Sequence, residues 1–382
     1  MNNQKADARP KIIIFSCFYD PFMSGAELFV KEVVERLADK YKFTIISARL
    51  DNKLPKFEER EHFDYYRVGL GSSFDKWLYP VLAARLAKKL KPDIVHGVME
   101  SYAGIAACRF KKKNQNTPTI LTLQSGDLDD PSKHIPKWLW KKIHVTPDRI
   151  TAISTALGRR AEKLGVPKEK IAIIPNGVDL ELAKNSRSEH VPGRIVTVAR
   201  LSWEKGLDYL IRAMPAVIKE CPEAHLVMVG EGDRRGEIEG LIQELGIEGR
   251  VTLLGRLPHE KTLEEIGKSE VFICPSLAEG LGIVFIEAQA CGVAVIGTRV
   301  GGIPDVIDDE ASGLLVEPKN SEDIEKALIR LLENLELRER LVRVALERID
   351  RFDWNRVVRE VADEYDKLLG DANIRIHAND AN

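Results

Sequence analysis

The sequence predicts an α/β protein with two open, parallel-sheet domains. In both halves of the chain, short apolar runs of strand type alternate with longer segments of helical periodicity. Between the halves, residues 182–193 are polar and end in Pro-Gly, which is typical of an interdomain linker. The clearest strand–helix–strand unit starts at Val271 and includes Cys274 to Gly292, and units of this kind build parallel sheets.

We expect one domain over residues 1–185, a second over residues 186–350, and a last helix with a mobile polar tail over residues 351–382. The strands are expected at residues 11–16, 43–47, 93–97, 120–123, 149–153, 171–174, 194–198, 226–229, 251–254, 271–273 and 293–296. Helices are expected at residues 26–40, from 283 onward, and at 321–334, 336–348 and 354–369, with Ser321 as an N-cap.

The composition argues against several classes of protein. The 382 residues carry a formal net charge of −2, so a general nucleic-acid binder is not expected. Five cysteines occur without a CxxC pair, which indicates reduced cytoplasmic thiols rather than a disulfide framework or a zinc site. The first residues lack the apolar run of a signal peptide, and no run of about 18 apolar residues predicts a transmembrane helix.

The loop at residues 279–282 reads Glu-Gly-Leu-Gly and precedes a helix that carries Glu287. Glycines let backbone N–H groups approach a ligand, and a helix N-terminus attracts phosphate. Because carboxylates repel an anion, we expect Glu279 and Glu287 to accept hydrogen bonds from sugar or ribose hydroxyls. The alternative is an ordinary strand-to-helix turn whose acids only favour the helix N-terminus.

Arg200 and Lys205 flank another strand-to-helix turn. Together they can neutralise a diphosphate, arginine through its planar fork and lysine as a point charge. In the alternative interpretation they are surface cations paired with Glu204 and Asp208.

The segment Gly230-Glu231-Gly232 resembles a dinucleotide fingerprint only superficially. The next glycine is Gly236, one residue too late for GxGxxG, and no acid follows at the expected distance. A nicotinamide-dependent dehydrogenase is therefore disfavoured.

Several candidate residues lie in the first half. Ser24-Gly25 precedes a helix and is a second place where backbone can meet phosphate. His96 ends a strand, although a lone histidine there is more often a structural hydrogen-bonder than a catalytic group. Asp127-Leu128-Asp129 is a DxD sequence without a supporting histidine, so a solvated acidic loop is favoured over a metal site.

Basic residues cluster in the first half, and one cluster contains tryptophans. Solvated helix faces are the favoured interpretation, and a membrane-surface patch that meets anionic headgroups is the sharper one. The clusters comprise Lys88, Lys89, Lys91, Arg109, Lys111, Lys112 and Lys113, followed by Lys133, Lys137, Trp138, Trp140, Lys141 and Lys142.

Taken in order, these motifs resemble glycosyltransferase family 4, the retaining enzymes of the GT-B fold. The resemblance covers residues 11–365, and its strongest part is the Glu-x7-Glu spacing with the upstream Arg/Lys pair. Its motifs are Gly25 before the first helix, Pro175-Asn176-Gly177-Val178-Asp179 at the domain border, Arg200 with Lys205, Gly230-Glu231-Gly232, Gly255-Arg256-Leu257, and Glu279 with Glu287.

The resemblance implies two Rossmann-like domains that face a cleft, with the last helix returning to the first domain. It implies that Arg200 and Lys205 bind the donor diphosphate and that Glu279 contacts the donor sugar, so that these three residues form the catalytic group. The resemblance also implies donor contacts at Gly25, Gln124 and Gly232. It places Arg256 and Leu257 at the base, the backbone of Gly280, Leu281, Gly282 and Ile283 at the donor sugar and phosphates, and Glu287 at the ribose. His96, Glu100 and Asp127 are the acceptor candidates in the first domain.

The resemblance further implies a UDP-, GDP- or ADP-sugar as co-substrate, no metal or other cofactor, and a glycan, lipid-linked or small-molecule acceptor. A cytoplasmic enzyme with a peripheral contact at the inner membrane face is expected, without a nucleic-acid partner. Two positions depart from the family, since Ser24 replaces a usual glycine and Gln124 replaces a usual histidine. A neutral amide can bond a sugar hydroxyl, but it cannot carry charge or a proton.

Other interpretations of the same motifs remain open from sequence alone. A sugar-nucleotide epimerase would need acid and base groups around the sugar, and a phosphorylase would need a phosphate or cofactor-lysine site that the sequence does not display. A non-catalytic nucleotide-sugar-binding protein is the third alternative, and Gln124 in place of histidine is its best support.

Overall fold

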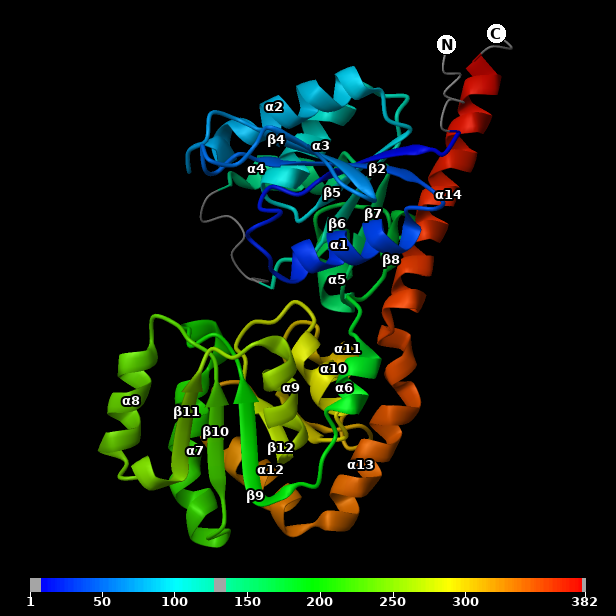
Figure 1. Cartoon of the computed structure of the whole chain (residues 1–382). Coiled ribbons are helices and arrows are strands. Elements are labelled where there is room, and N and C mark those ends of the chain that lie inside the picture. Colours follow the sequence, from blue (N-terminus) through cyan, green and yellow to red (C-terminus); the bar gives the residue numbers. More distant parts are fainter. Residues whose placement is uncertain (1–7, 127–134, 380–382) are drawn as a thin grey trace. The chain divides into compact units, whose positions relative to one another are not determined.

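The computed structural model describes residues 8–126 and 135–379, which form two compact units. The first unit contains residues 8–125, 135–176 and 354–379, and the second contains residues 177–353 together with Gly126. The chain therefore leaves the first unit after Asn176 and returns to it at Trp354 (Figure 1). Both units are α/β structures built on mainly parallel sheets, so the predicted fold class is confirmed.

The sheet of the first unit has the order β3-β4-β2-β1-β5-β6-β7-β8. All neighbouring strands are parallel except β3 and β4, which are antiparallel at one edge. The strands are β1 (Lys11–Phe15), β2 (Lys42–Ala48), β3 (Phe57–Glu59), β4 (Phe63–Val68), β5 (Ile94–Val98), β6 (Thr119–Leu123), β7 (Arg149–Ala152) and β8 (Ile171–Ile173).

Helices cover both faces of this sheet because its strands are buried on both sides. Ile12 and Ile14 of β1 pack with α1 and α14, whereas the alternate residues Ile13 and Phe15 pack with α2 and α3. The helices of this unit are α1 (Gly25–Leu37), α2 (Asp75–Leu90), α3 (Tyr102–Lys111), α4 (Lys137–Val145), α5 (Thr155–Lys163) and α14 (Trp354–Asn379).

The last helix is longer than the sequence analysis expected. It was predicted to end at residue 369 before a mobile tail, but α14 continues to Asn379. The polar residues after Gly370 include no proline, and polar composition alone does not end a helix. The helix is fixed to the unit by Val357, Val358, Val361 and Tyr365, which lie in its core.

The sheet of the second unit has the order β11-β10-β9-β12-β13-β14, and every pair in it is parallel. With the strands counted from β9, this is the order 3-2-1-4-5-6 of the doubly wound nucleotide-binding fold. The strands are β9 (Val191–Val198), β10 (His225–Val229), β11 (Val251–Gly255), β12 (Ser269–Cys274), β13 (Ala294–Thr298) and β14 (Leu314–Val316).

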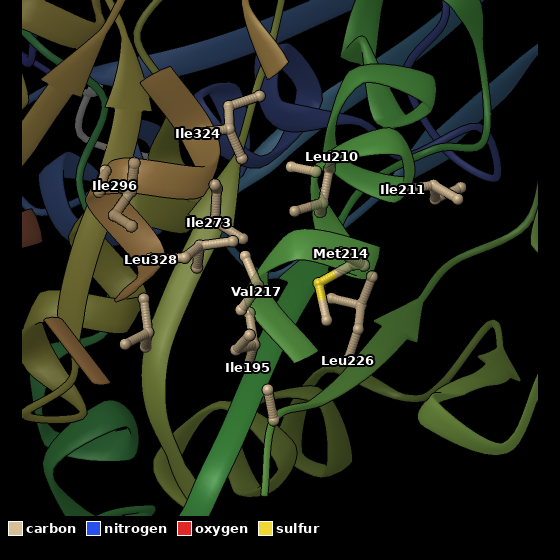
Figure 2. Close-up of a cluster of buried hydrophobic side chains, with 14 of the residues drawn as sticks. Ile195, Leu210, Ile211, Met214, Val217, Leu226, Ile273, Ile296, Ile324 and Leu328 are labelled. Atoms are coloured by element: carbon tan, nitrogen blue, oxygen red, sulfur yellow. The ribbon is translucent and has the colours of Figure 1, made fainter. Parts of the chain in front are cut away.

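Alternating strand residues and the apolar faces of α7 and α12 form the core of the second unit. Figure 2 shows Ile195 of β9 and Ile273 of β12 among Leu210 and Met214 of α7 and Leu328 of α12. The helices are α6 (Leu180–Asn185), α7 (Leu207–Glu220), α8 (Arg235–Glu244), α9 (His259–Gly267), α10 (Ile283–Ala290), α11 (Ile303–Val306), α12 (Ser321–Glu333) and α13 (Leu335–Arg348).

Residues 182–193, expected as a linker, instead form the end of α6, a short loop at 186–190 and the start of β9. Asp179 caps α6 because its carboxylate accepts a hydrogen bond from the Leu182 N–H at 3.0 Å. The N-cap of α12 is Asn320 rather than the expected Ser321. The border between the units at residues 176 and 177 precedes the border at residue 185 that the sequence suggested.

Candidate active site

The candidate active site of the second unit lies where the strand order reverses. β9 and β12 are neighbours in the centre of the sheet, but their following connections lead to opposite sides of it. The loops at their carboxyl ends therefore diverge and open a crevice, which is the usual ligand site of such sheets. These loops carry Arg200 and Lys205 after β9, and Glu279 to Gly282 after β12.

Hydrogen bonds and one glycine hold the two loops together. The N–H of Leu277 donates to the carbonyl oxygen of Glu204 at 2.7 Å. Gly206 has φ +60°, and a Cβ at this position would lie 2.3 Å from the carbonyl oxygen of Pro275. A side chain here would push the loops apart, so the sequence between Lys205 and the start of α7 needs a glycine.

Lys205 and Glu279 form an ion pair across the two loops. The ammonium nitrogen of Lys205 lies 2.7 Å from Oε2 of Glu279, with the side chains 21% and 17% exposed. Burial alone would lower the pKa of Lys205, but the nearby carboxylates, chiefly Glu279, raise it above its ordinary value. Lys205 therefore stays charged at neutral pH, and two of its three N–H donors remain for a ligand.

Arg200, Lys205 and Glu279 line one cavity of about 480 Å³, with Glu204 and Trp203 also in its wall. The structure thus brings together the three residues predicted to form the catalytic group. Two cations beside two carboxylates create a site that can hold both an anionic and a hydroxyl-bearing part of one ligand.

The Glu279 loop leads directly into the N-terminus of α10. Gly282 is the N-cap residue with φ +90°, and the Gly280 N–H donates to Oε1 of Glu279 at 3.2 Å. The Gly302 N–H donates to the carbonyl oxygen of Glu279 at 3.1 Å, which anchors the loop from the β13 side. The Leu281 side chain is buried, so only its backbone is available to a ligand.

Glu287 follows in the second turn of α10 and bonds to a residue that the sequence analysis missed. Nε2 of His259, the first residue of α9, lies 2.7 Å from Oε1 of Glu287. The only sequence signal for His259 was its place directly after Gly255-Arg256-Leu257-Pro258. Arg256 is exposed and Leu257 is half-buried at the carboxyl end of β11.

Gly232 is explained by packing within the protein. A Cβ there would lie 2.2 Å from the carbonyl oxygen of Leu201, and the Leu201 N–H donates to the backbone carbonyl oxygen of Glu231 at 3.0 Å. The glycine therefore lets the loops after β9 and β10 pack closely. A donor contact of Gly232 stays a prediction.

In the first unit, His96 is not available to an acceptor, which corrects its place among the acceptor candidates. It is fully buried, with Nδ1 2.6 Å from the hydroxyl of Tyr365 and Nε2 2.6 Å from Oγ1 of Thr122. Burial lowers the pKa of His96 to about 3, so the ring is neutral at physiological pH. The geometry supports the structural role that the sequence analysis left open.

Glu100 also serves the protein itself, because it is almost fully buried and both carboxylate oxygens are occupied. Oε1 pairs with Arg160, and Oε2 accepts from the N–H groups of Gln124 at 3.0 Å and Ser125 at 3.4 Å. This corrects the expectation that Glu100 contacts an acceptor directly. Its role is to fix the loop after β6.

The same loop orients Gln124. Its Nε2 donates to Oδ1 of Asn176 at 3.2 Å, and Nδ2 of Asn176 donates back to Oε1 of Gln124 at 2.9 Å. Gln124 is thus held by a side-chain amide pair and by the Glu100 carboxylate. No proton transfer is available from this amide.

The remaining site candidates of the first unit are Gly25 and Asp127. Gly25 is the exposed first residue of α1, and Ser24 before it forms a capping box with Glu27. Asp127 lies outside the described residues, as do Asp129 and Lys133. No helix within residues 8–126 and 135–379 combines the length and apolar composition needed to cross a membrane.

Two family models match this chain. The model of glycosyltransferase family 4 matches residues 23–182, and the model of glycosyl transferases group 1 matches residues 180–348.

Several glycosyltransferases are similar in sequence to this chain over most of its length. An uncharacterized glycosyltransferase of Methanocaldococcus jannaschii is 29% identical over 93% of this chain and 97% of its own. N-acetyl-alpha-D-glucosaminyl L-malate synthase of Bacillus anthracis is 27% identical, with the same two shares of 93% and 97%. D-inositol 3-phosphate glycosyltransferase of Nocardiopsis dassonvillei is 28% identical over 72% of this chain and 70% of its own.

Solved structures share the fold at lower identity. The sucrose-phosphate synthase of Thermosynechococcus elongatus superposes with a TM-score of 0.79 at 24% identity, over 95% of this chain and 100% of its own. The HepE protein of Anabaena, solved with UDP and glucose, gives a TM-score of 0.75 at 19% identity, over 94% and 100%. With the two models adjoining along residues 23–348, the chain belongs to the family 4, group 1 glycosyltransferases, enzymes of the GT-B fold.

Proposed function

We propose that this glycosyltransferase moves a sugar from a nucleoside-diphosphate sugar to a hydroxyl of a glycan or lipid-linked acceptor, with retention of the anomeric configuration. The observation that carries the proposal is the cavity lined by Arg200, Lys205 and Glu279 beside the N-terminus of α10. Cations suit the diphosphate, and carboxylates suit the hydroxyls of the sugar. The solved HepE structure, which has the same fold, holds UDP and glucose.

In the proposed reaction, the bond from the anomeric carbon to the diphosphate oxygen breaks toward an oxocarbenium-like state. Arg200 and Lys205 stabilise the charge that develops on the departing diphosphate, an effect of several kcal/mol in a pocket of low dielectric. The acceptor oxygen then bonds to the anomeric carbon from the same face. Its proton passes to the leaving phosphate, since no general base is assigned in the cavity.

Metal-independent transfer is part of the proposal. Lys205 stays charged because Glu279 raises its pKa, so Lys205 and Arg200 supply the positive charge that a divalent cation supplies in other transferases. Chelation should therefore leave turnover unchanged.

The test is release of nucleoside diphosphate from a panel of UDP-, GDP- and ADP-sugars, measured with and without EDTA. Proton NMR of the product then gives the anomeric configuration. Release with retention, insensitive to EDTA, is the expected result. Inversion of the anomeric configuration would overturn the retaining mechanism. Loss of turnover with EDTA, restored by added magnesium, would overturn metal-independent transfer.

A surface of the first unit supports a lipid-linked acceptor at a membrane. We name it the aromatic face, defined by Phe74, Trp77 and Leu78 at the start of α2 and by Trp138 of α4, all well exposed. Exposed aromatic side chains next to lysines match the interface of an anionic membrane. The lysines that these helices and the C-cap of α3 carry are Lys76 in α2, Lys112 at that C-cap, and Lys137, Lys141 and Lys142 in α4.

An apolar cavity of about 500 Å³ lies beside the aromatic face. It is lined by Trp77 and Val81 of α2, Tyr102 and Ile105 of α3, and Leu139 of α4, with Arg109 as its cation. The rings of Trp77 and Tyr102 meet edge to face at 5.4 Å. An apolar wall next to a guanidinium suits a hydrocarbon chain with an anionic headgroup. Trp140 does not contribute, because it is buried against His144.

Vesicle sedimentation tests this membrane contact. The protein should co-sediment with vesicles containing phosphatidylglycerol and less with pure phosphatidylcholine, and high salt should release it. Trp77→Ala with Trp138→Ala should weaken binding several-fold, whereas Phe57→Ala, an exposed aromatic on β3, should not. Equal binding of all variants would overturn the contact, while donor hydrolysis would still test the transferase.

A further inference from the structure

The hydrogen bond between His259 and Glu287 joins two helices of the second unit. His259 is the first residue of α9, Glu287 lies in the second turn of α10, and these helices are in contact. The Nε2–Oε1 distance is 2.7 Å, with the His259 side chain 53% exposed and the Glu287 side chain 14% exposed. A half-exposed histidine therefore holds a largely buried carboxylate.

We infer that His259 is a positioning residue that presents the Glu287 carboxylate to the ribose hydroxyls of the donor nucleotide. The inference rests on the proposed function, in which Glu287 binds that ribose. Only one carboxylate oxygen is engaged by the imidazole. Among the described residues, no donor contacts Oε2 of Glu287, so this oxygen can accept from a hydroxyl.

Fixing the carboxylate before the donor arrives has an energetic consequence. A free glutamate side chain loses rotamer freedom when it binds a ligand, which weakens the binding. The bond to His259 removes part of that loss in advance, because Oε1 is already tied to α9. Preorganisation of this kind is expected to strengthen ribose binding roughly fivefold.

The charge around His259 favours the protonated ring. A cation at a helix N-terminus is disfavoured by the helix dipole, and burial also opposes it. The hydrogen bond to Glu287 of α10 nevertheless raises the pKa of His259, with the charges of Glu287, Asp179 at the α6 N-cap and Glu260 of α9 adding to it. The bond is thus charge-assisted below this raised pKa and weaker above it.

The sign of the pH dependence follows from this arrangement. Below the pKa of His259, the imidazolium holds Glu287 most firmly, so nucleotide binding should be tightest there. As pH rises through that pKa, the ring becomes neutral and the affinity should fall. A variant without the imidazole should lack this dependence.

The experiment compares a nucleotide with its analogue that lacks the ribose hydroxyls. A thermal-shift panel first selects the tightest of UDP, GDP and ADP for the full-length protein. Titration calorimetry then measures its affinity and that of the 2′,3′-dideoxy form for the wild type, His259→Ala and His259→Gln, between pH 6 and 9. His225→Gln is the matched control, since His225 is a partly buried histidine of the same unit that bonds Thr252 at 2.8 Å.

We expect His259→Ala to weaken the ribonucleotide roughly fivefold and to leave the dideoxy form unchanged. His259→Gln should keep most of the preference for the ribonucleotide over the dideoxy form, but this preference should not depend on pH. His225→Gln should match the wild type. In turnover, KM for the donor should rise while kcat stays the same.

Three outcomes separate the claims. If His259→Ala keeps the full preference for the ribose hydroxyls, the positioning role is overturned while the proposed function stands. If both forms weaken equally, His259 acts on another part of the nucleotide and the inference again fails. If none of the three nucleotides binds the wild type, the proposed function itself fails.

Discussion

At the scale of single residues, Lys205 is the side chain on which the proposed chemistry depends most. It is the cation that joins the β9 loop to Glu279 in the cavity. We expect Lys205→Ala to lower kcat by about 100- to 1,000-fold, as the loss of one charge-stabilising donor does in other enzymes. The measurement is nucleoside diphosphate release by stopped assay, with circular dichroism to verify the fold.

Lys219→Ala is the control for that change, because Lys219 lies on α7 of the same unit with its side chain 82% exposed. It should leave kcat and stability unaffected. Full activity of Lys205→Ala would refute the role of Lys205 at the diphosphate.

His96 predicts how stability depends on pH. Its pKa is about 3 in the folded protein and about 6.5 when unfolded, so between these values only the unfolded chain binds the proton. Above pH 6.5 the His96 ring is neutral in both states and does not change the free energy of unfolding. Below pH 6.5 the unfolded chain takes up a proton, so the free energy of unfolding decreases as the pH falls. Between pH 7 and pH 5 the loss should be about 2 kcal/mol.

Urea unfolding of the first unit at both pH values measures this loss. His96→Gln should be less sensitive to the pH change than the wild type, whereas His62→Gln, which removes an exposed histidine, should keep the wild-type sensitivity. If the free energy of unfolding changed equally between the two pH values in all three proteins, His96 could not be the source of the pH dependence.

At the scale of elements, α14 is a structural part of the first unit. Arg149 pairs with Glu364, the Tyr41 hydroxyl bonds Asp366 at 2.6 Å, and Tyr365 is fully buried beside His96. Tyr365→Ala should therefore destabilise the first unit by about 3–5 kcal/mol. Arg359→Ala, on the exposed face of the same helix, should stay within about 0.5 kcal/mol.

Amide hydrogen exchange measures this effect locally. Tyr365→Ala should speed exchange in β1 and β5 of the first unit and leave β12 of the second unit unchanged. Unchanged exchange in β1 would mean that α14 contributes little to that core.

Which elements the sequence revealed depended on how regular each segment is. The long apolar strands and the Glu279–Glu287 unit were predictable because their hydrophobic period is strong. β3 was missed because Phe57-Glu58-Glu59 contains no apolar run. β14 was missed because its apolar run stops at three residues, whereas the equally short β8 belongs to a run of four that extends to Ile174. The strand β4, which lies between β3 and β2, was also missed, since Phe63–Val68 mixes charged and aromatic residues.

The site residues divide in the same way. Arg200, Lys205 and Glu279 were predictable because each lies in the connection between a strand and the next helix, and parallel strands place such connections at one edge of the sheet. The burial of Glu100 and His96 was not, because it depends on Arg160 and Tyr365, which lie far along the chain. His259 was missed for the same reason, since nothing local links it to Glu287.

At the scale of the whole molecule, each unit has its own core, so each should respond separately to a core substitution. Leu210→Ala removes a fully buried side chain of the second unit, and Phe29→Ala does so in the first. Each substitution should lower the midpoint temperature of one of two calorimetric transitions by about 5–10 °C. A bound donor nucleotide should raise the transition that Leu210→Ala lowers, because the candidate donor residues lie mainly in that unit.

A single transition that both variants lower equally would contradict this separation. It would mean that the two units unfold as one cooperative body.

The return of the chain at Trp354 also has a consequence for biosynthesis. Apart from the short segment at Gly126, the second unit is the continuous stretch 177–353, so it can complete its fold as soon as that stretch has left the ribosome. The first unit begins earlier but must wait for its closing helix, and until then the apolar surface that receives Val357, Val361 and Tyr365 stays uncovered. The N-terminal half of the nascent chain therefore exposes apolar surface until the last helix has been synthesised. This is the interval in which protection by chaperones would matter most.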